Sequence, residues 1–253
     1  MRASRPVRAL VTVGAVGMTV LSLAGAAGAA QALPNPGPPS GTNGWTVYHG
    51  DPLGTGVASG PGPIDTSTPV WTSPVLDGQL YGQPLEFDGR VFVATENDTV
   101  VALDDATGQV VWSRHLGTPV PATALPCGDI QPVEGITGTP VIDPARAEIF
   151  VVADEFVHGT STHVLVGLGT TSGTVEFAQN VDPPGSDTAA LLQRTGLTLD
   201  DGQVVFGFGG NYGDCSVYHG WVEAVAETGG TPVRFELDSG PGERQGAVWM
   251  GGA

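Results

Sequence analysis

A segment recurs in this chain at a fixed interval of 56 residues, and this repeat constrains the fold more than any other feature. Gly82-Gln-Pro-Leu, Gly138-Thr-Pro-Val and Arg194-Thr-Gly-Leu each open a similar pattern. Self-similarity at a period of this length indicates one supersecondary unit that is used several times, with each copy burying its apolar face against a neighbour.

The clearest copy, residues 82–117, has the pattern of four short antiparallel strands. Its apolar stretches are separated by Asp-Gly, by Glu-Asn-Asp and by Asp-Asp-Ala-Thr-Gly, all of which favour tight turns. No stretch between the repeats has the spacing of an amphipathic helix, which argues against a parallel βαβ design. Four-stranded units repeated about an axis are typical of a β-propeller. We therefore predict an all-β propeller with blades at residues 82–117, 138–182 and 194–238.

The turn between the third and fourth strands shows best that the repeats are related. Gly108 and Gly173 stand where a three-residue hairpin requires a positive φ, and Asp104 is placed to accept hydrogen bonds from turn amides. A large aromatic residue follows this turn in every copy. Its recurrence predicts packing between neighbouring blades, and the residues concerned are Trp112, Phe177 and Phe235.

Residues 69–73, Pro-Val-Trp-Thr-Ser, match the last strand of a repeat but have no three strands before them. We expect this orphan strand to complete the last blade of a ring, with Trp71 in the aromatic position. Three repeats and one strand do not close a ring, since propellers have at least four blades. The chain is therefore predicted to form an incomplete propeller. It is either the N-terminal part of a longer one or a unit whose open edges are covered by another copy.

Residues 1–32 are predicted to be a secretory signal peptide. Arg2, Arg5 and Arg8 precede an uncharged, apolar run that ends in Ala-Gln-Ala. The run is long enough to span a bilayer, but its many glycines and alanines and its small-residue end favour cleavage. We expect residues 33–69 to be an extended linker with a lead-in segment, followed by blades over residues 70–253. No other segment has the length to cross a membrane, so we expect a secreted, extracellular or cell-envelope protein.

The chain is strongly acidic, with a net charge of −17. Without the signal peptide it keeps 26 acidic and six basic residues, a formal charge of −20. Such a surface repels phosphate backbones, which excludes nucleic acid as a partner. It favours either solubility or the attraction of cations into clefts.

Cys127 and Cys215 are the only cysteines. Export would bring them into an oxidising compartment, where pairing is the default, so we predict one disulfide. Two free, buried thiols are the alternative.

The stretch Ala-Leu-Asp-Asp-Ala-Thr-Gly-Gln-Val-Val-Trp at residues 102–112, preceded by Val-Phe-Val-Ala-Thr, resembles the repeat of pyrroloquinoline-quinone (PQQ) type propellers. Trp45-Thr-Val-Tyr-His-Gly-Asp, followed by Thr55-Gly, is similar to the lead-in segment of exported proteins with such repeats. The resemblance covers most of residues 45–253 and implies the propeller fold. It does not fix an activity, because the family includes quinoprotein dehydrogenases, outer-membrane assembly scaffolds of the BamB kind and other exported proteins.

The resemblance also implies which cysteines and metal ligands each class of family member carries. The dehydrogenases have a disulfide between adjacent cysteines beside the quinone, and carboxylate and amide ligands for a calcium ion. This chain has no adjacent cysteine pair. The assembly scaffolds carry an acylated cysteine at the mature N-terminus, and no cysteine follows the predicted cleavage region.

Strand order predicts where a site lies. In an up-and-down blade, the connection between strands two and three and the connection between blades open on one face, and the other two connections open on the opposite face. The second class is short throughout, whereas the first holds every long insertion, namely residues 118–137, 154–162, 183–193 and 207–220. Recognition is usually carried by such loops.

We expect a protein partner or a small polar ligand on this face. Aromatic residues beside carboxylates suit a sugar, a small polar ligand or a peptide end. The candidate binding residues are Asp129, Glu134, Arg194, Tyr212, Asp214, Tyr218, His219 and Trp221.

No catalytic residue and no metal site are predicted. His158 and His163 with Asp154 and Glu155 suit a zinc-like ion by residue type, but their spacing matches no established site. Serine and histidine occur without a Gly-x-Ser-x-Gly elbow, which gives a hydrolase no support.

The leading hypothesis is an exported, non-catalytic binding or scaffolding propeller that needs no cofactor. The alternative is a divergent PQQ-dependent oxidoreductase with PQQ and calcium, and a third reading is a purely structural envelope protein.

Overall fold

The structure is a computed structural model that describes residues 44–58 and 67–249. The predicted signal peptide and most of the predicted linker, residues 1–43 and 59–66, lie outside the described residues. Within the described ranges, no helix has the length and apolarity needed to cross a membrane.

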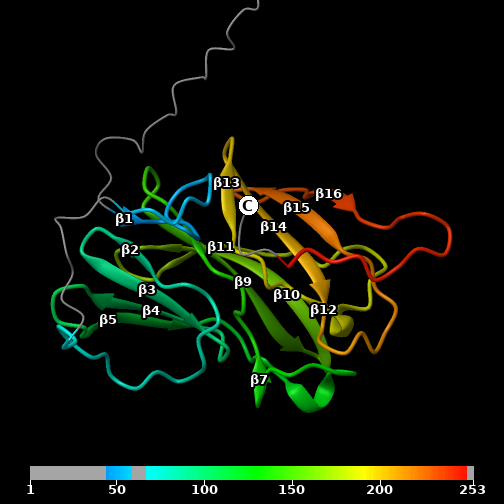
Figure 1. The fold of residues 1–253 in the computed structure, drawn as a ribbon, viewed down its shortest axis with the longest axis horizontal. Helices are drawn as coiled ribbons and strands as arrows, with labels where there is room; N and C mark the ends of the chain where they lie inside the picture. The colour runs from blue at the N-terminus through cyan, green and yellow to red at the C-terminus, as the bar shows by residue number, and fades with distance from the viewer. Residues whose placement is uncertain (1–43, 59–66, 250–253) are drawn as a thin grey trace, which may run out of the picture. The chain divides into compact units, whose positions relative to one another are not determined.

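Three blades of four antiparallel strands follow one another along the chain, as predicted (Figure 1). The strands of blade 1 are β2 (Leu85–Phe87), β3 (Arg90–Thr95), β4 (Thr99–Asp104) and β5 (Val110–His115). Blade 2 contains β8 (Val141–Asp143), β9 (Glu148–Val157), β10 (Thr160–Gly169) and β11 (Val175–Asn180). Blade 3 contains β13 (Thr198–Asp200), β14 (Gln203–Gly210), β15 (Trp221–Ala226) and β16 (Val233–Glu236).

Short elements join these blades. Strand β1 (Gly44–Trp45) pairs with β2, and β12 (Leu191–Leu192) pairs with the end of β14. The connection between blades 1 and 2 folds into a two-stranded sheet of β6 (Val120–Pro121) and β7 (Val133–Glu134). Two single-turn 3₁₀ helices, η1 (Ala122–Ala124) and η2 (Thr188–Ala190), lie in the connections between blades.

The middle blade is buried on both faces. Along β9, Ile149 and Val151 pack with blade 1, whereas Phe150 and Val152 pack with blade 3. This alternation is the two-residue period of a strand. Because a fully buried side chain of this size contributes about 1.5–3 kcal/mol, the two interfaces between blades form the main core of the described fold.

An aromatic side chain joins blade 1 to blade 2. The Trp112 indole Nε1 donates to the carbonyl oxygen of Thr170 at 2.9 Å, and Trp112 is only 9% exposed. Gly173, whose φ is +66°, makes room for the indole, because a Cβ atom there would lie 2.6 Å from Trp112 Cε3. Its missing side chain therefore serves both the turn and the interface.

Trp71 packs on blade 1 in the same way. Its Nε1 donates to the carbonyl oxygen of Asp105 at 2.7 Å, and its ring lies over Gly108, whose φ is +71°. Residues 69–73 nevertheless form no strand, so the predicted orphan strand is wrong for the described residues. The aromatic contact forms without strand pairing, since this segment has no neighbouring strands with which to make a ladder.

The aromatic residue of blade 2 approaches blade 3. Phe177 approaches the turn of that blade, where a Cβ atom at Gly229 would lie 3.7 Å from its ring. Phe235 is 68% exposed, and the described residues include no following blade, so the packing role expected of it stays a prediction.

Blade ends are held together by short turns. A backbone hydrogen bond joins the turn between strands one and two to the turn between strands three and four in every blade. These bonds run from Asp105 N to Gly89 O (3.2 Å), from Thr170 N to Ala147 O (2.9 Å) and from Glu227 N to Gly202 O (3.1 Å). We call this end of the blades the short-turn face.

Candidate ligand-binding face

The long connections gather at the other end of the blades. Thr118 O accepts from Phe156 N at 2.6 Å, Ala190 O accepts from Asn211 N at 3.0 Å, and Ser216 Oγ donates to Asp187 at 2.7 Å. Residues 118–137, 183–193 and 211–220 therefore contact their neighbours and form one surface, which we call the insertion face.

Residues 154–162 do not form the loop expected of them. The strands β9 and β10 continue through this stretch and reverse at His158 and Gly159, which have φ values of 53° and 87°. The sequence places this stretch among the long insertions between strands two and three. In the structure Ser161 Oγ donates to Asp154 Oδ1 across the hairpin, and the strands pair through to Val157 and Thr160.

Cys127 and Cys215 lie beside each other on the insertion face. The backbone N–H of Cys215 donates to Cys127 Sγ at 3.2 Å, and both thiols are free in the structure. Two insertions that are 88 residues apart in sequence thus meet at the cysteines.

The predicted binding residues separate into exposed and buried groups. Tyr212 is 70% exposed, and Asp129, Arg194 and Asp214 are also exposed. Glu134, Tyr218 and Trp221 are buried, and His219 is partly buried. Only the exposed residues are placed to meet a partner without rearrangement.

Specific contacts hold several of these side chains in position. Tyr218 Oη donates to Asp214 Oδ1 at 2.7 Å, and burial together with this bond raises the pKa of Tyr218 to about 12. The Arg194 guanidinium lies over the Tyr81 ring, 5.8 Å from its centre. Such a cation–π contact orients an exposed arginine. His219 Nδ1 lies 3.2 Å from the carbonyl oxygen of Asp238.

A cluster of buried carboxyl groups lies beneath residues 118–137. Glu96 and Asp98 come from the turn between β3 and β4, Glu134 from β7 and Asp154 from β9, and each is at most 3% exposed. Glu96 Oε2 accepts from Gly135 N at 2.7 Å and from Thr137 Oγ1 at 3.1 Å. From the sequence, Glu134 is a binding candidate and Asp154 with His163 suits an ion by residue type, but Glu96 and Asp98 are not among the candidates.

A histidine extends the cluster toward blade 3. Asp154 Oδ1 accepts from Ser161 Oγ at 2.7 Å and lies 3.9 Å from His163 Nε2. His163 Nδ1 lies 2.9 Å from Asp182 Oδ1, which also accepts from the His163 backbone N–H. His163 is thereby connected to two carboxyl groups, those of Asp154 and Asp182.

Several oxygens of the cluster have no hydrogen-bond partner. They are Glu96 Oε1, both oxygens of Asp98, both oxygens of Glu134 and Asp154 Oδ2. An ionised carboxylate without partners is costly to bury, so such groups retain protons. Burial raises the pKa of Glu96 to about 7 and that of Asp98 to about 9, and it also raises the pKa values of Glu134 and Asp154.

The cluster does not fit a calcium ion with PQQ. Among residues 44–58 and 67–249, no three histidine, cysteine, aspartate or glutamate side chains are arranged to hold a metal ion. Cys127 and Cys215 meet in space but are not neighbours in sequence, unlike the cysteine pair that the resemblance implies. No chemical step through a quinone is therefore derived from these residues.

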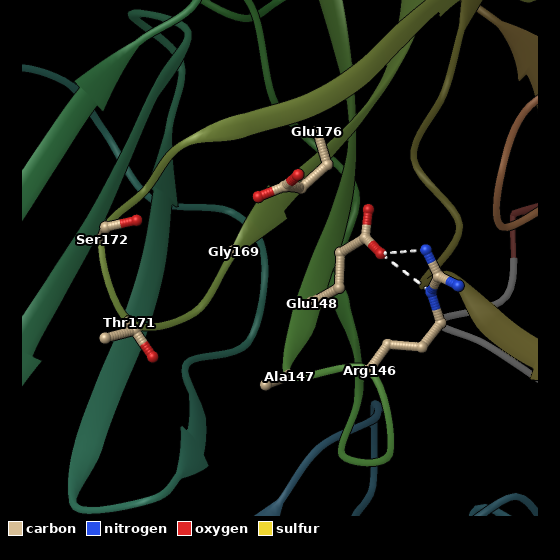
Figure 2. A pocket seen from close by; sticks show the side chains of 7 residues that line it. All are labelled: Arg146, Ala147, Glu148, Gly169, Thr171, Ser172 and Glu176. Carbon is tan, nitrogen blue, oxygen red and sulfur yellow. Dashed lines mark hydrogen bonds and ion pairs between the residues drawn. The ribbon is translucent and has the colours of Figure 1, made fainter.

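A hollow of about 510 Å³ opens at the short-turn end of blade 2 (Figure 2). It is lined by Arg146, Ala147, Glu148, Gly169, Thr171, Ser172 and Glu176. Arg146 binds one oxygen of Glu148 through Nε (2.8 Å) and Nη2 (2.7 Å). Loop length predicts a site on the opposite face, so the sequence does not indicate this hollow.

Comparison with known proteins identifies the family. The family profile described as outer membrane protein assembly factor BamB matches residues 35–230. The chain belongs to this family of PQQ-like β-propellers. A search of the curated proteins finds no match.

Solved structures share the fold of this PQQ-like propeller. Quinohemoprotein alcohol dehydrogenase ADHIIG from Pseudomonas putida HK5 aligns with a TM-score of 0.55 at 15% identity over 76% of this chain and 26% of its own. Quinohemoprotein alcohol dehydrogenase from Comamonas testosteroni aligns with a TM-score of 0.54 at 18% identity over 78% of this chain and 28% of its own. This chain thus spans about a quarter of the length of these enzymes, and at this identity the likeness shows the fold alone.

Proposed function

We propose that this chain is part of an exported, non-catalytic binding propeller that takes a protein or a small polar ligand on the insertion face. The observation that carries the proposal is the gathering of the long connections at one end of the blades. At the other end, the connections between the described strands are short turns tied together by backbone bonds. Scaffolds that present loops in this way are typical of recognition proteins.

The chemistry of the exposed residues supports a polar ligand. Tyr212 presents an aromatic surface, and the exposed residues Asp129, Asp214 and Arg194 carry charges of both signs. An aromatic ring beside charged hydrogen-bonding groups suits a sugar or a peptide end. A disulfide between Cys127 and Cys215 would fix two of the insertions and pre-organise the surface.

A labelled sample of the full chain on oligosaccharide and peptide arrays tests the proposal. We expect bound ligands to be lost in a Tyr212→Ser, Asp214→Asn double variant. An Asp201→Asn variant, altered at an exposed residue on the short-turn face, serves as the matched control and should bind as the parent does. If the Asp201→Asn control lost ligands that the double variant still bound, the placement of the site on the insertion face would be contradicted.

The dehydrogenase alternative has its own test. Thermal-shift and calorimetric titration with PQQ and Ca²⁺, followed by assays of alcohol and sugar oxidation, would detect it. Tight binding of both together with oxidation would favour the quinoprotein reading over the binding propeller.

A further inference from the structure

The last part of the connection between blades 1 and 2, residues 133–137, crosses directly over the buried carboxyl cluster. Gly135 lies so close to the cluster that a Cβ atom there would come within 2.7 Å of Asp98 Oδ1. Its N–H donates to Glu96 Oε2 at 2.7 Å, and its carbonyl oxygen accepts from Asp154 N at 3.3 Å. This stretch is therefore held to both blades at the cluster, and we call it the cover segment.

The cover segment contributes a carboxyl group of its own. Glu134 is fully buried, and neither of its oxygens has a hydrogen-bond partner among the described residues. On the blades, Asp98 is also fully buried with both oxygens unpaired, and Glu96 and Asp154 each keep one oxygen unpaired. The charges of Glu96 and Asp154 act on Glu134. Carboxyl groups thus face each other across the contact between the cover segment and blades 1 and 2.

The charges around the cluster do not balance it. His163 opposes Asp154 but is already held by Asp182, and Arg194 opposes Glu96 from its place over a tyrosine ring. The charged groups that act on the cluster from the surrounding described elements are the cations Arg194 and His163 and the anions Glu155 and Asp182, with His115 acting on Glu155. If the four carboxyl groups ionised, anions would outnumber cations on both sides of the contact.

Ionisation would therefore oppose the closed position of the cover segment. A carboxylate without partners is costly to bury, and like charges across a contact repel each other. Burial raises the pKa of Glu96 to about 7 and that of Asp98 to about 9, and it also raises the pKa of Glu134. The contact is favoured while these groups are protonated, and this advantage is lost as the pH rises through the raised values.

Lifting the cover segment relieves this cost with little loss of packing. The contacts between blades are apolar, and their two clusters contain none of the four carboxyl groups. Ile136 is the one residue of the cover segment in those clusters. Its backbone N–H donates to Thr95 O at a long 3.4 Å. Because hydrophobic stabilisation follows the apolar area that is buried, opening the segment costs far less than separating the blades.

We propose that residues 133–137 act as a pH-sensitive cover, closed over Glu96, Asp98, Glu134 and Asp154 while these groups carry protons and open once they have lost them. Opening is local: the blades stay packed while the segment moves outward and water reaches the carboxyl groups. The proposal goes beyond the binding function proposed above and does not depend on it, because no ligand takes part.

Hydrogen–deuterium exchange of the full chain at pH 6 and pH 9 tests the proposal. Dividing the intrinsic exchange rate at each pH by the measured rate gives a protection factor for each segment. We expect the protection factors of residues 133–137 to fall about tenfold or more between the two pH values, since each proton released on opening shifts the equilibrium about tenfold per pH unit. Those of residues 149–152 and 165–168, in the core strands of blade 2, should fall much less.

Two variants test whether the cluster causes the opening. Glu134→Gln and Asp98→Asn each replace a buried carboxyl group by a neutral amide of nearly the same shape. Each should keep more protection in the cover segment at pH 9 than the parent does, and circular dichroism at pH 6 checks that each is folded. The two are independent, so one folded variant is sufficient for the test.

Asp201→Asn, at an exposed carboxyl group on the short-turn face, is the matched control and should show the same fall in protection as the parent. Equal falls in the cover segment and in the core strands of blade 2 would overturn the proposal, because the opening would then be global. A fall that Glu134→Gln and Asp98→Asn leave unchanged would overturn it as well, because the carboxyl groups would not be its cause.

Discussion

The indole ring of Trp112 lies directly on Gly173 of the following blade, so that a Cβ atom at Gly173 would lie 2.6 Å from Trp112 Cε3. Trp71 has the same relation to Gly108, although it belongs to no strand. The contact is therefore a property of the aromatic ring and the turn glycine and does not depend on a complete fourth strand.

Replacing Trp112 by alanine should destabilise the fold by ~3–5 kcal/mol, because the substitution leaves a cavity between blades 1 and 2 and removes the bond to Thr170. Urea unfolding followed by circular dichroism measures this loss. His219→Ala is the comparison, since His219 is partly exposed and should change stability by less than about 0.5 kcal/mol. Equal losses from the two substitutions would refute the assignment of these roles.

Replacing Trp71 by alanine should cost less, about 1–2 kcal/mol. The substitution removes one hydrogen bond, to Asp105, and a ring that is only partly buried. The same urea titration separates the two tryptophans. A loss at Trp71 as large as that at Trp112 would mean that residues 69–73 support more of the fold than their contacts indicate.

Stability should decrease as the pH rises from 5 to 9. Burial raises the folded pKa of Asp98 to about 9 and that of Glu96 to about 7, so the folded state binds more protons than the unfolded state above the unfolded pKa values near 4. The raised pKa of His163, held by Asp154 and Asp182 against the opposing effect of burial, acts in the same direction. The stabilisation is complete below the unfolded pKa values and is lost as the pH rises through the folded ones.

Asp98→Asn provides the specific check. Asparagine tolerates the φ of 53° at this turn, and it is neutral at every pH. We expect the variant to be more stable than the parent at pH 8, by on the order of a few kcal/mol, and to show a flatter profile of melting temperature against pH. An unchanged slope would show that Asp98 is ionised in the folded protein.

Cys127 and Cys215 should form a disulfide when the protein is purified from an oxidising compartment. Their loops already meet, and closing a loop of this length stabilises by about 4–5 kcal/mol in the chain-entropy model. We expect no reaction with a thiol reagent in denaturant until a reductant is added, and a lower melting temperature after reduction. Two thiols that titrate without reductant would contradict the prediction.

The sequence predicted the blades well, because their signals are local. Turn residues at fixed positions indicate where the strands end. The structure confirms the positive φ predicted at Gly108 and Gly173. It also confirms the turn bond predicted for Asp104, whose Oδ1 accepts from Thr107 N at 2.8 Å. The prediction of a long insertion at residues 154–162 is wrong, since the strands β9 and β10 pair through this stretch. Here Asp154 is buried with Ser161 and near His163, and only the folded hairpin brings them together.

The candidate sites were less predictable, because they depend on contacts between distant segments. Glu96, Glu134 and Asp154 lie on three different elements and meet only when residues 118–137 fold over blades 1 and 2. The hollow beside Arg146 and Glu148 is lined by two turns of blade 2, which come together only in the folded sheet. Neither arrangement leaves a recognisable spacing in the chain.

The backbone bonds between Asp105 and Gly89, Thr170 and Ala147, and Glu227 and Gly202 involve main-chain atoms only. Many sequences with turns of the same length can therefore preserve them. Proteins with this framework can therefore change the loops of the insertion face during evolution while the backbone bonds of the short-turn face are kept. Binding specificity can then change without a change of fold.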